Sequence, residues 1–298
     1  MSRPTGSVAP PPPHQAAHDP PSPLDQLFAG THHYLLTCPD HPSSRPPQVQ
    51  RLKGALERGE FEVHYQPIVS TRTGQVVKVE ALLRWRPPGQ PLIGPDDFLA
   101  LLDATGELAD VSTWVLQEAC RAAARWPHIR VAVNLSGAQF LTGHFVSTVQ
   151  QALRDTGVPA EALELELTEG MLLTPACSTS LALRELKACG VRVVLDDFGT
   201  GYANLSCLQA FEFDGLKLDR SLIRPLQHQE ARSRTLVQGL VDLSRRLHLE
   251  LTAEGVETHR QHQTLRAMNV PLMQGYLFAR PQPHWPASRA NRFMRPKS

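Results

Sequence analysis

Polar side chains that could do chemistry stand at or near the ends of eight short β-prone runs. They are Gln66, Glu80, Asn134, Glu166, Asp196 with Asp197, Lys217 with Asp219, Glu254 with Glu257, and Gln274. Any one of them could simply start a turn or cap a helix. Together they are better explained by one site, because a barrel of parallel strands brings the carboxyl ends of its strands to a common rim.

Carboxylates dominate this set, and their charges conflict. Neighbouring carboxylates raise each other's pKa, and burial raises it further, so several cannot stay ionised in one pocket without compensation. Lys217 and Arg84 supply too little positive charge, whereas one or two divalent cations would be enough. Oxygen ligands without histidine favour Mg²⁺ or Mn²⁺ over zinc. These residues therefore predict metal-dependent chemistry on a phosphate ester or on an enolate, and spacing alone leaves both open.

The β-prone runs alternate with helix-period segments, which is typical of an α/β fold. The runs cover residues 61–69, 76–85, 131–135, 163–168, 191–198, 215–219, 250–256 and 272–278. Helical spacing is seen over 114–126, over 180–188 before Gly190, and in the row Leu236, Leu240, Leu243 and Leu247. Eight such repeats predict a (β/α)8 TIM-type barrel.

The first two runs are an exception to this alternation. Only about six residues around Thr73-Gly74 separate them, which is too few for a crossover helix, so they must form a hairpin. At least one barrel strand is therefore expected to run antiparallel to its neighbours.

Composition sets the domain boundaries and excludes several classes of protein. Twelve of the 26 prolines lie in residues 1–47, which predicts a Pro-rich disordered segment before a barrel over 48–283 and a basic tail over 284–298. Thirty basic and 29 acidic residues do not suit a protein that coats polymeric nucleic acid. The longest apolar run, 98–102, is far too short to span a membrane. Five cysteines without paired spacing favour reduced thiols and a cytoplasmic location.

Several blocks of the sequence resemble one known family. Glu80-Ala81-Leu82-Leu83-Arg84-Trp85 resembles the signature of EAL domains, phosphodiesterases that hydrolyse cyclic di-GMP. Further blocks are similar to the family's, in the usual order: Tyr65-Gln66-Pro67-Ile68, Val133-Asn134-Leu135-Ser136, Glu166-Leu167-Thr168-Glu169, Asp196-Asp197-Phe198-Gly199-Thr200-Gly201-Tyr202, Lys217-Leu218-Asp219-Arg220-Ser221, Ala253-Glu254-Gly255-Val256-Glu257-Thr258 and Gln274-Gly275-Tyr276. The likeness covers about four-fifths of the chain, and the ordered blocks are far more specific than three letters alone.

The resemblance implies a role for each matching residue. Metal ligands would be Glu80, Asn134, Glu166, Asp196 and Asp197, with Lys217 and Glu254 acting on the attacking water. Substrate contacts would be Gln66, Arg84, Asp219, Glu257 and Gln274, and Glu169 would brace the loop 197–206, which in the family links metal binding to dimerisation. The expected activity is metal-dependent hydrolysis of cyclic di-GMP to linear pGpG by a homodimer with Mg²⁺ or Mn²⁺. The alternative is a non-catalytic receptor of the same fold that binds cyclic di-GMP and signals through partner contacts.

Overall fold

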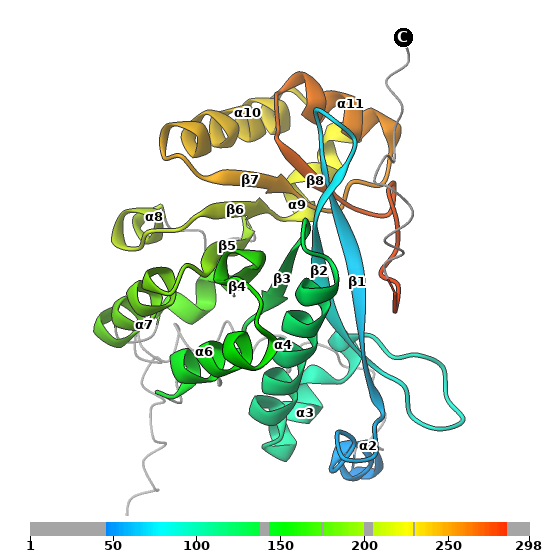
Figure 1. Ribbon diagram of the computed structural model, residues 1–298. Helices are drawn as coiled ribbons and strands as arrows, with labels where there is room; N and C mark the ends of the chain where they lie inside the picture. The colour runs from blue at the N-terminus through cyan, green and yellow to red at the C-terminus, as the bar shows by residue number, and fades with distance from the viewer. Residues whose placement is uncertain (1–45, 138–142, 174–175, 200–204, 229, 285–298) are drawn as a thin grey trace, which may run out of the picture. The chain divides into compact units, whose positions relative to one another are not determined.

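The computed structural model describes residues 46–137, 143–173, 176–199, 205–228 and 230–284, without the side chains of 46–48, 169, 173 and 176–178. Eight strands close into a barrel in sequence order (Figure 1). They are β1 (Phe61–Ser70), β2 (Val76–Trp85), β3 (Arg130–Asn134), β4 (Leu163–Thr168), β5 (Arg192–Phe198), β6 (Gly215–Leu218), β7 (Glu250–Ala253) and β8 (Leu272–Gln274). The predicted barrel is confirmed.

The predicted hairpin is also confirmed. Strand β1 pairs antiparallel with both β2 and β8, whereas the other neighbours are parallel. Strand β2 pairs with β3 only over residues 78–81, while its pairing with β1 continues to Trp85 opposite Phe61. The hairpin therefore extends beyond the mouth of the barrel, and Gln66 and Glu80 lie inside their strands rather than at the ends.

Two strands end earlier than their β-prone runs predicted. Strand β7 stops before Gly255, which has a φ of 63°, and β8 stops before Gly275. A Cβ atom on Gly275 would lie 2.1 Å from the carbonyl oxygen of Val256, so the two turns cross where only glycine fits. Backbone hydrogen bonds fasten this crossing, since Val256 donates to Gln274 and accepts from Leu277.

Helices separate the parallel strands as expected. The α-helices are α2 (Pro46–Leu52), α3 (Leu99–Thr105), α4 (Leu108–Arg125), α6 (Phe145–Thr156), α7 (Ala176–Ala188), α8 (Ser206–Ala210), α9 (Arg220–Ile223), α10 (Ala231–Arg246) and α11 (His259–Ala267). Short 3-10 turns are η1 (Pro95–Asp97), η2 (Ala160–Ala162), η3 (Glu169–Leu173) and η4 (Arg224–His228). In the described part of the chain, no helix combines the length and apolar character that crossing a membrane requires.

The predicted N-terminal and C-terminal segments lie almost entirely outside the described residues. Residues 1–45 and 285–298 lie outside the described residues, so the expected disorder of 1–47 and the basic tail stay predictions. Helix α2 begins at Pro46, two residues inside the predicted N-terminal segment.

Helix α10 forms where leucine spacing predicted a helix, but the leucines are not its most buried face. Val237 and Val241 are the residues buried against the barrel, at 0% and 2% exposure. Leu236 and Leu247 are 52% and 44% exposed. Helical periodicity identifies the helix correctly, but valines one position along the helix make its deepest contacts.

The end of the barrel opposite the mouth is closed by an ion network. Lys78 Nζ lies 2.6 Å from Glu164 Oε1 and 2.5 Å from Glu250 Oε1, and both Lys78 and Glu164 are 1% exposed. Arg130 contacts both acids, at 3.3 and 2.8 Å. Burial acts to raise the pKa of Glu250, but Lys78 and Arg130 outweigh it and lower the pKa to about 2. Paired charges rather than apolar side chains fill this end of the barrel. Removing one of them would leave a buried charge without its partner and would destabilise the fold.

We expect Glu250→Gln to lower the free energy of unfolding by about 2 kcal/mol at neutral pH. The unfolded carboxyl titrates near 4.5 and the folded one near 2, so this stabilisation is complete above pH 4.5 and is lost as the pH falls toward 2. Urea unfolding at several pH values measures it, with the exposed Glu212→Gln as the matched control. If the difference in unfolding free energy between the parent and Glu250→Gln does not shrink in acid, the lowered pKa of Glu250 is wrong.

Candidate metal and substrate site

Neighbouring strands place the predicted polar residues side by side. Residues that are paired across a sheet point their side chains to the same face. The Cα of Gln66 pairs with that of Glu80, and the Cα of Asn134 pairs with that of Glu166. Asp196 follows two residues after the partner of Glu166 on β5, so it points to the same inner face.

The ammonium group of Lys217 lies at the centre of these side chains. Its Nζ atom is 2.8 Å from Glu166 Oε2, 3.4 Å from Asp196 Oδ1 and 3.6 Å from Glu80 Oε2. Glu254 Oε1 is 2.5 Å away, although not in hydrogen-bond alignment. Lys217 is 2% exposed, so one buried cation is shared by four carboxylates from four strands or strand ends.

Amide side chains complete the network around Glu80. Asn134 Nδ2 donates to Glu80 Oε1 at 2.6 Å, and Gln274 Nε2 donates to Glu80 Oε2 at 2.5 Å. Gln274 also donates to Gln66 Oε1 at 3.1 Å, and Gln66 in turn donates to the carbonyl of Ala279. The two antiparallel neighbours of the barrel, β1 and β8, are thereby tied to the first acid of the ring.

The pKa values reflect a shortage of positive charge. Burial, followed by neighbouring acids, raises the pKa of Glu166 and Asp196, and it raises that of Glu254 to about 8. Glu80 is different: burial opposes ionisation, but Lys217 and the amide donors lower its pKa. The surrounding acids outweigh burial and raise the pKa of Lys217 well above its ordinary value, so the ammonium stays protonated.

Unused oxygens in this ring fit a divalent cation. Glu166 Oε1 is buried and, within the described residues, has no hydrogen-bond donor. Asp196, Asp197 and Glu254 each offer an oxygen, and these atoms lie within 4.8 Å of one another. Asp197 reaches this position with a φ of 56°, and burial and the charge of Asp196 raise its pKa to about 6. Carboxylate and amide oxygens are the ligand atoms that hard divalent cations prefer.

A small pocket of about 180 Å³ opens beside the ring. Its walls are Gln66, Glu80, Leu82, Arg220, Glu254, Gly255, Glu257, Gln274, Gly275 and Tyr276. Four further predicted site residues therefore line the same pocket as Glu80, namely Gln66, Glu254, Glu257 and Gln274. The sequence blocks contain Leu82, Arg220 and Tyr276, but residue types alone assigned them no role. Strand alternation could have identified Leu82, because it follows Glu80 by two positions on the same face.

Local hydrogen bonds hold three of the predicted substrate-contact residues. Arg84 is half-buried and donates to the carbonyl of Leu83, and Glu257 is held through its backbone N–H by Gln261 Oε1 at 2.8 Å. Asp219 accepts the backbone N–H of Ser221 at 2.8 Å and so caps α9. The side chain of Glu169 and residues 200–204 of the loop that it would brace lie outside the described part.

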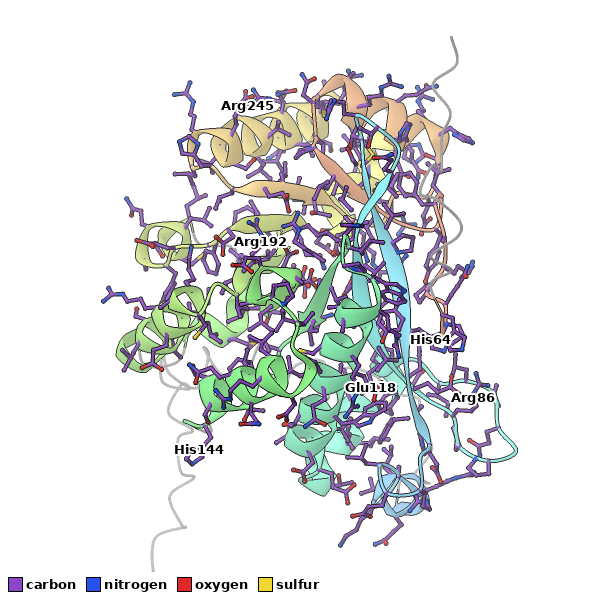
Figure 2. All side chains as sticks on the ribbon, viewed as in Figure 1. His64, Arg86, Glu118, His144, Arg192 and Arg245 are labelled. Atoms are coloured by element: carbon purple, nitrogen blue, oxygen red, sulfur yellow. The ribbon has the colours of Figure 1, made fainter. Side chains whose placement is uncertain are left out.

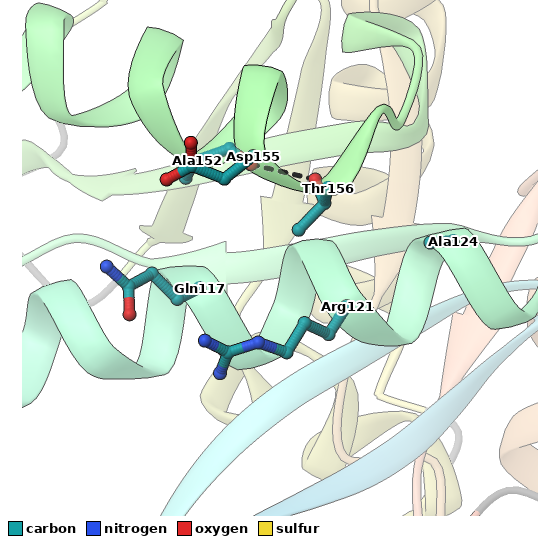
Figure 3. A pocket seen from close by; sticks show the side chains of 6 residues that line it. All are labelled: Gln117, Arg121, Ala124, Ala152, Asp155 and Thr156. Carbon is teal, nitrogen blue, oxygen red and sulfur yellow. Dashed lines mark hydrogen bonds between the residues drawn. The ribbon is translucent and has the colours of Figure 1, made fainter.

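Another hollow, of about 310 Å³, lies on the outer surface between α4 and α6. Gln117, Arg121, Ala124, Ala152, Asp155 and Thr156 line it (Figure 3). None of the predicted site residues is among them. The clustered carboxylates lie at the barrel mouth and not in this groove.

Comparison with known proteins gives a consistent family. The EAL domain family matches residues 49–281. A protein named cyclic di-GMP phosphodiesterase NbdA, from Pseudomonas aeruginosa, is 40% identical over 239 residues, 78% of this chain and 30% of the relative. Cyclic di-GMP phosphodiesterase PdeR from Escherichia coli is 34% identical over 236 residues, 78% of this chain and 35% of the relative.

A solved structure agrees with these sequence relatives. It is described as the PaMucR phosphodiesterase in complex with c-di-GMP, and its TM-score is 0.75 at 38% identity, covering 81% of this chain and 98% of that one. The chain spans about a third of the length of NbdA and PdeR. With the family match extending over the whole described barrel, the chain belongs to the EAL domain family.

Proposed function

We propose that this protein hydrolyses cyclic di-GMP to linear pGpG in a reaction that depends on a divalent cation. The observation that carries the proposal is the ring of four carboxylates around the single ammonium of Lys217, in which the buried Oε1 atom of Glu166 has no donor among the described residues. Relatives named cyclic di-GMP phosphodiesterases support the choice of substrate over an enolate. Every acid and amide expected of the metal site is present and contributes to one mouth.

The cation would be Mg²⁺ or Mn²⁺, held by oxygens of five residues on four neighbouring strands, β2 to β5. The proposed ligands are Glu80, Asn134, Glu166, Asp196 and Asp197. When bound, such a cation lowers the pKa of a coordinated water and neutralises charge on phosphoryl oxygens. Asn134 and Gln274 fix the orientation of the Glu80 carboxylate through their hydrogen bonds.

Lys217 and Glu254 are the proposed catalytic residues. Lys217 is protonated and surrounded by acceptors, so it orients a nucleophilic water by donating a hydrogen bond. Glu254 touches Lys217 and also lines the pocket, which places a carboxylate between the buried ring and the substrate. That position suits transfer of a proton from the attacking water.

Substrate contacts are proposed for residues at the rim. Gln66, Glu257 and Gln274 line the pocket, where their amide and carboxylate groups can hydrogen-bond a guanine edge. Arg84 would exchange the carbonyl of Leu83 for a phosphate, to which its planar guanidinium can donate twice. A substrate contact by Asp219 would compete with its capping of α9.

Two further proposals concern the whole protein. We infer a cytoplasmic homodimer in which Glu169 braces the loop 197–206, and a Pro-rich segment over 1–47 that stays disordered. The first rests on the family resemblance and the reduced cysteine pattern, and the second on composition. The non-catalytic receptor is the outcome to be expected if nucleotide binding occurs without product.

We expect Glu80→Gln to abolish measurable turnover, because the substitution removes the charge at the centre of the amide network. Ion-exchange chromatography of products from cyclic di-GMP, with Mg²⁺ or Mn²⁺ and with chelator, tests this. Glu212→Gln, on an exposed surface, is the matched control. Equal rates of linearisation by Glu80→Gln and the parent would refute the proposed chemistry, and tight binding without product by the parent would favour the receptor.

Lys217→Ala should slow turnover by about 100-fold or more if the ammonium orients the water. Lys217→Arg restores charge but not the compact geometry, so we expect it to fold like the parent and to remain slow. Steady-state kinetics with circular dichroism separates catalysis from folding. Unchanged turnover in both variants would remove this role from Lys217 while leaving the carboxylate ring in place.

Divalent cations should stabilise the fold because they relieve repulsion in the ring. At a free Mn²⁺ concentration a hundred times its dissociation constant, the gain is about 2.7 kcal/mol, or about 5–10 °C in unfolding temperature for a barrel of this size. Calorimetry of chelator-treated protein with and without Mn²⁺ measures the gain. Glu166→Gln should lose most of the shift and Glu212→Gln should keep it; an equal shift in both would place the cation elsewhere.

A further inference from the structure

The barrel sheet alone does not fix the position of Arg84, the proposed phosphate contact. Strand β2 pairs with β3 only as far as Ala81, so residues 82–85 have β1 as their strand neighbour and a single bridge from Trp85 to Ile93. A two-stranded ribbon is only marginally stable in water. Contacts outside the barrel sheet must therefore hold this end of the hairpin.

Arg84 and Trp85 point to opposite faces of this ribbon. Side chains alternate along a strand, so Arg84 shares a face with Glu80 and Leu82, which both line the pocket. Burial lowers the pKa of Arg84, and it is opposed by Glu80 and by Tyr276, another wall of the pocket. Trp85 points the other way and is 4% exposed. The placement of Trp85 thus determines where Arg84 meets the pocket.

Trp85 is anchored in a small apolar cluster apart from the main barrel core. The buried members of this satellite core are Leu52, Ala55, Phe61, Trp85, Phe98, Leu102 and Val111. The rings of Trp85 and Phe98 meet edge to face, with 6.0 Å between their centroids. Helices α2 and α3, which supply two of the members, lie at this end of the hairpin (Figure 1). Apolar packing is non-directional, so a polar contact is needed to set the orientation of the indole.

The carboxylate of Glu60 supplies that directional contact. Glu60 is 7% exposed, and its Oε2 atom accepts a hydrogen bond from Trp85 Nε1 at 3.1 Å. Its carbonyl accepts the N–H of Arg86 at 2.7 Å, and its own N–H donates to the carbonyl of Ala55 at 3.0 Å. Arg86 itself lies on the surface beside this end of the hairpin (Figure 2). Glu60 therefore holds both a side chain and the backbone where β2 ends.

Arg58 keeps this carboxylate charged and ties it to α2. Its Nε atom donates to Glu60 Oε1 at 2.7 Å, and its other nitrogens donate to two carbonyls at the end of the helix, those of Arg51 and Lys53. Arg58 lowers the pKa of Glu60, burial opposes this effect, and Trp85 adds to the lowering. Both oxygens of Glu60 are thus used at the hairpin end, away from the ring around Lys217.

We propose that Glu60 is a positioning residue for substrate binding: by holding the indole of Trp85, it sets where Arg84 meets a phosphate of the nucleotide. The inference rests on the proposed function, because Arg84 acts on the substrate only if cyclic di-GMP binds at the mouth. Glu60 is not a wall of the pocket, so its effect must pass through Arg84. A purely stabilising role would lower fold stability and would not depend on Arg84.

Steady-state kinetics of the full chain with cyclic di-GMP tests this dependence. Glu60→Ala should raise KM about tenfold and leave kcat within about twofold, because a contact made equally in the ground and transition states changes KM alone. Arg84→Ala should raise KM about 100-fold, since it removes a charged hydrogen-bond donor. In the Arg84→Ala protein, adding Glu60→Ala should change KM by less than about twofold, because both substitutions act on one contact. Glu57→Ala, which removes an exposed carboxylate between α2 and β1, is the matched control and should behave like the parent.

Two milder substitutions separate positioning from misfolding. Glu60→Gln retains an oxygen that can accept the Trp85 N–H, so KM should stay within about threefold of the parent. Trp85→Phe keeps an aromatic ring in the satellite core but removes the donor, so KM should rise about fivefold or more. Thermal unfolding followed by circular dichroism completes the test. Glu60→Ala should lower the unfolding temperature equally with and without Arg84, because the substrate contact does not contribute to the free protein.

The contrary outcomes are distinct. Additive increases in KM from Glu60→Ala and Arg84→Ala would overturn the inference, because Glu60 would then act independently of Arg84. A Glu60→Ala protein with the parental KM, or with a loss confined to kcat, would also overturn it. A parent that does not linearise cyclic di-GMP refutes the proposed function and the inference together, whereas an active parent with additive variants refutes the inference alone.

Discussion

One buried ammonium group holds the working end of this barrel together. Lys217 is within 3.6 Å of carboxylates from β2, β4, β5 and the turn after β7, so it links strands that are not neighbours in the sheet. A single positive charge cannot balance these acids, and burial magnifies the imbalance. The mouth is therefore stable enough to fold but electrostatically incomplete, which is the condition under which a binding cation contributes most.

Inward-pointing residues on the same strands form charge clusters at both ends of the barrel, but the two clusters differ in their balance of charge. On β2, Lys78 and Glu80 point inward two residues apart, and on β4 Glu164 and Glu166 do the same. Lys78 and Glu164 belong to the ion network at the closed end, in which lysine and arginine balance the acids. Glu80 and Glu166 belong to the ring at the mouth, in which Lys217 is one cation among four carboxylates. Stability is thus concentrated at the closed end, and the charge deficit at the open end.

Much of this arrangement could be predicted from the sequence, because strand alternation and the carboxyl-end rule act locally. All eight strands, the hairpin and the acids of the ring follow from such patterns. The early ends of β7 and β8 do not, since they depend on the crossing of Gly275 with Val256, two segments distant in sequence. The lower ion network was missed as well, although inward charges at Lys78 and Glu164 were a usable signal.

Helix α10 and Asp219 are two further cases in which the sequence pattern did not predict what the side chains contact. Leucine spacing establishes a helix but not which side faces the barrel, because the exposed edge with Leu236 and Leu247 and the buried edge with Val237 and Val241 have the same period. Asp219 looks like a site residue by position, yet its side chain caps α9.

The charge deficit also constrains the order of events in the proposed reaction. Cyclic di-GMP carries two phosphodiester charges, so a mouth that holds only Lys217 among Glu80, Glu166 and Asp196 repels it. Arg84 at the rim offsets only part of that repulsion while it is donating to Leu83. In the proposed reaction, cations would therefore enter before or together with the nucleotide, so that its phosphate can approach the ring. Because the acids that repel the nucleotide also attract cations, binding of the cation and binding of the substrate would reinforce each other in the proposed reaction.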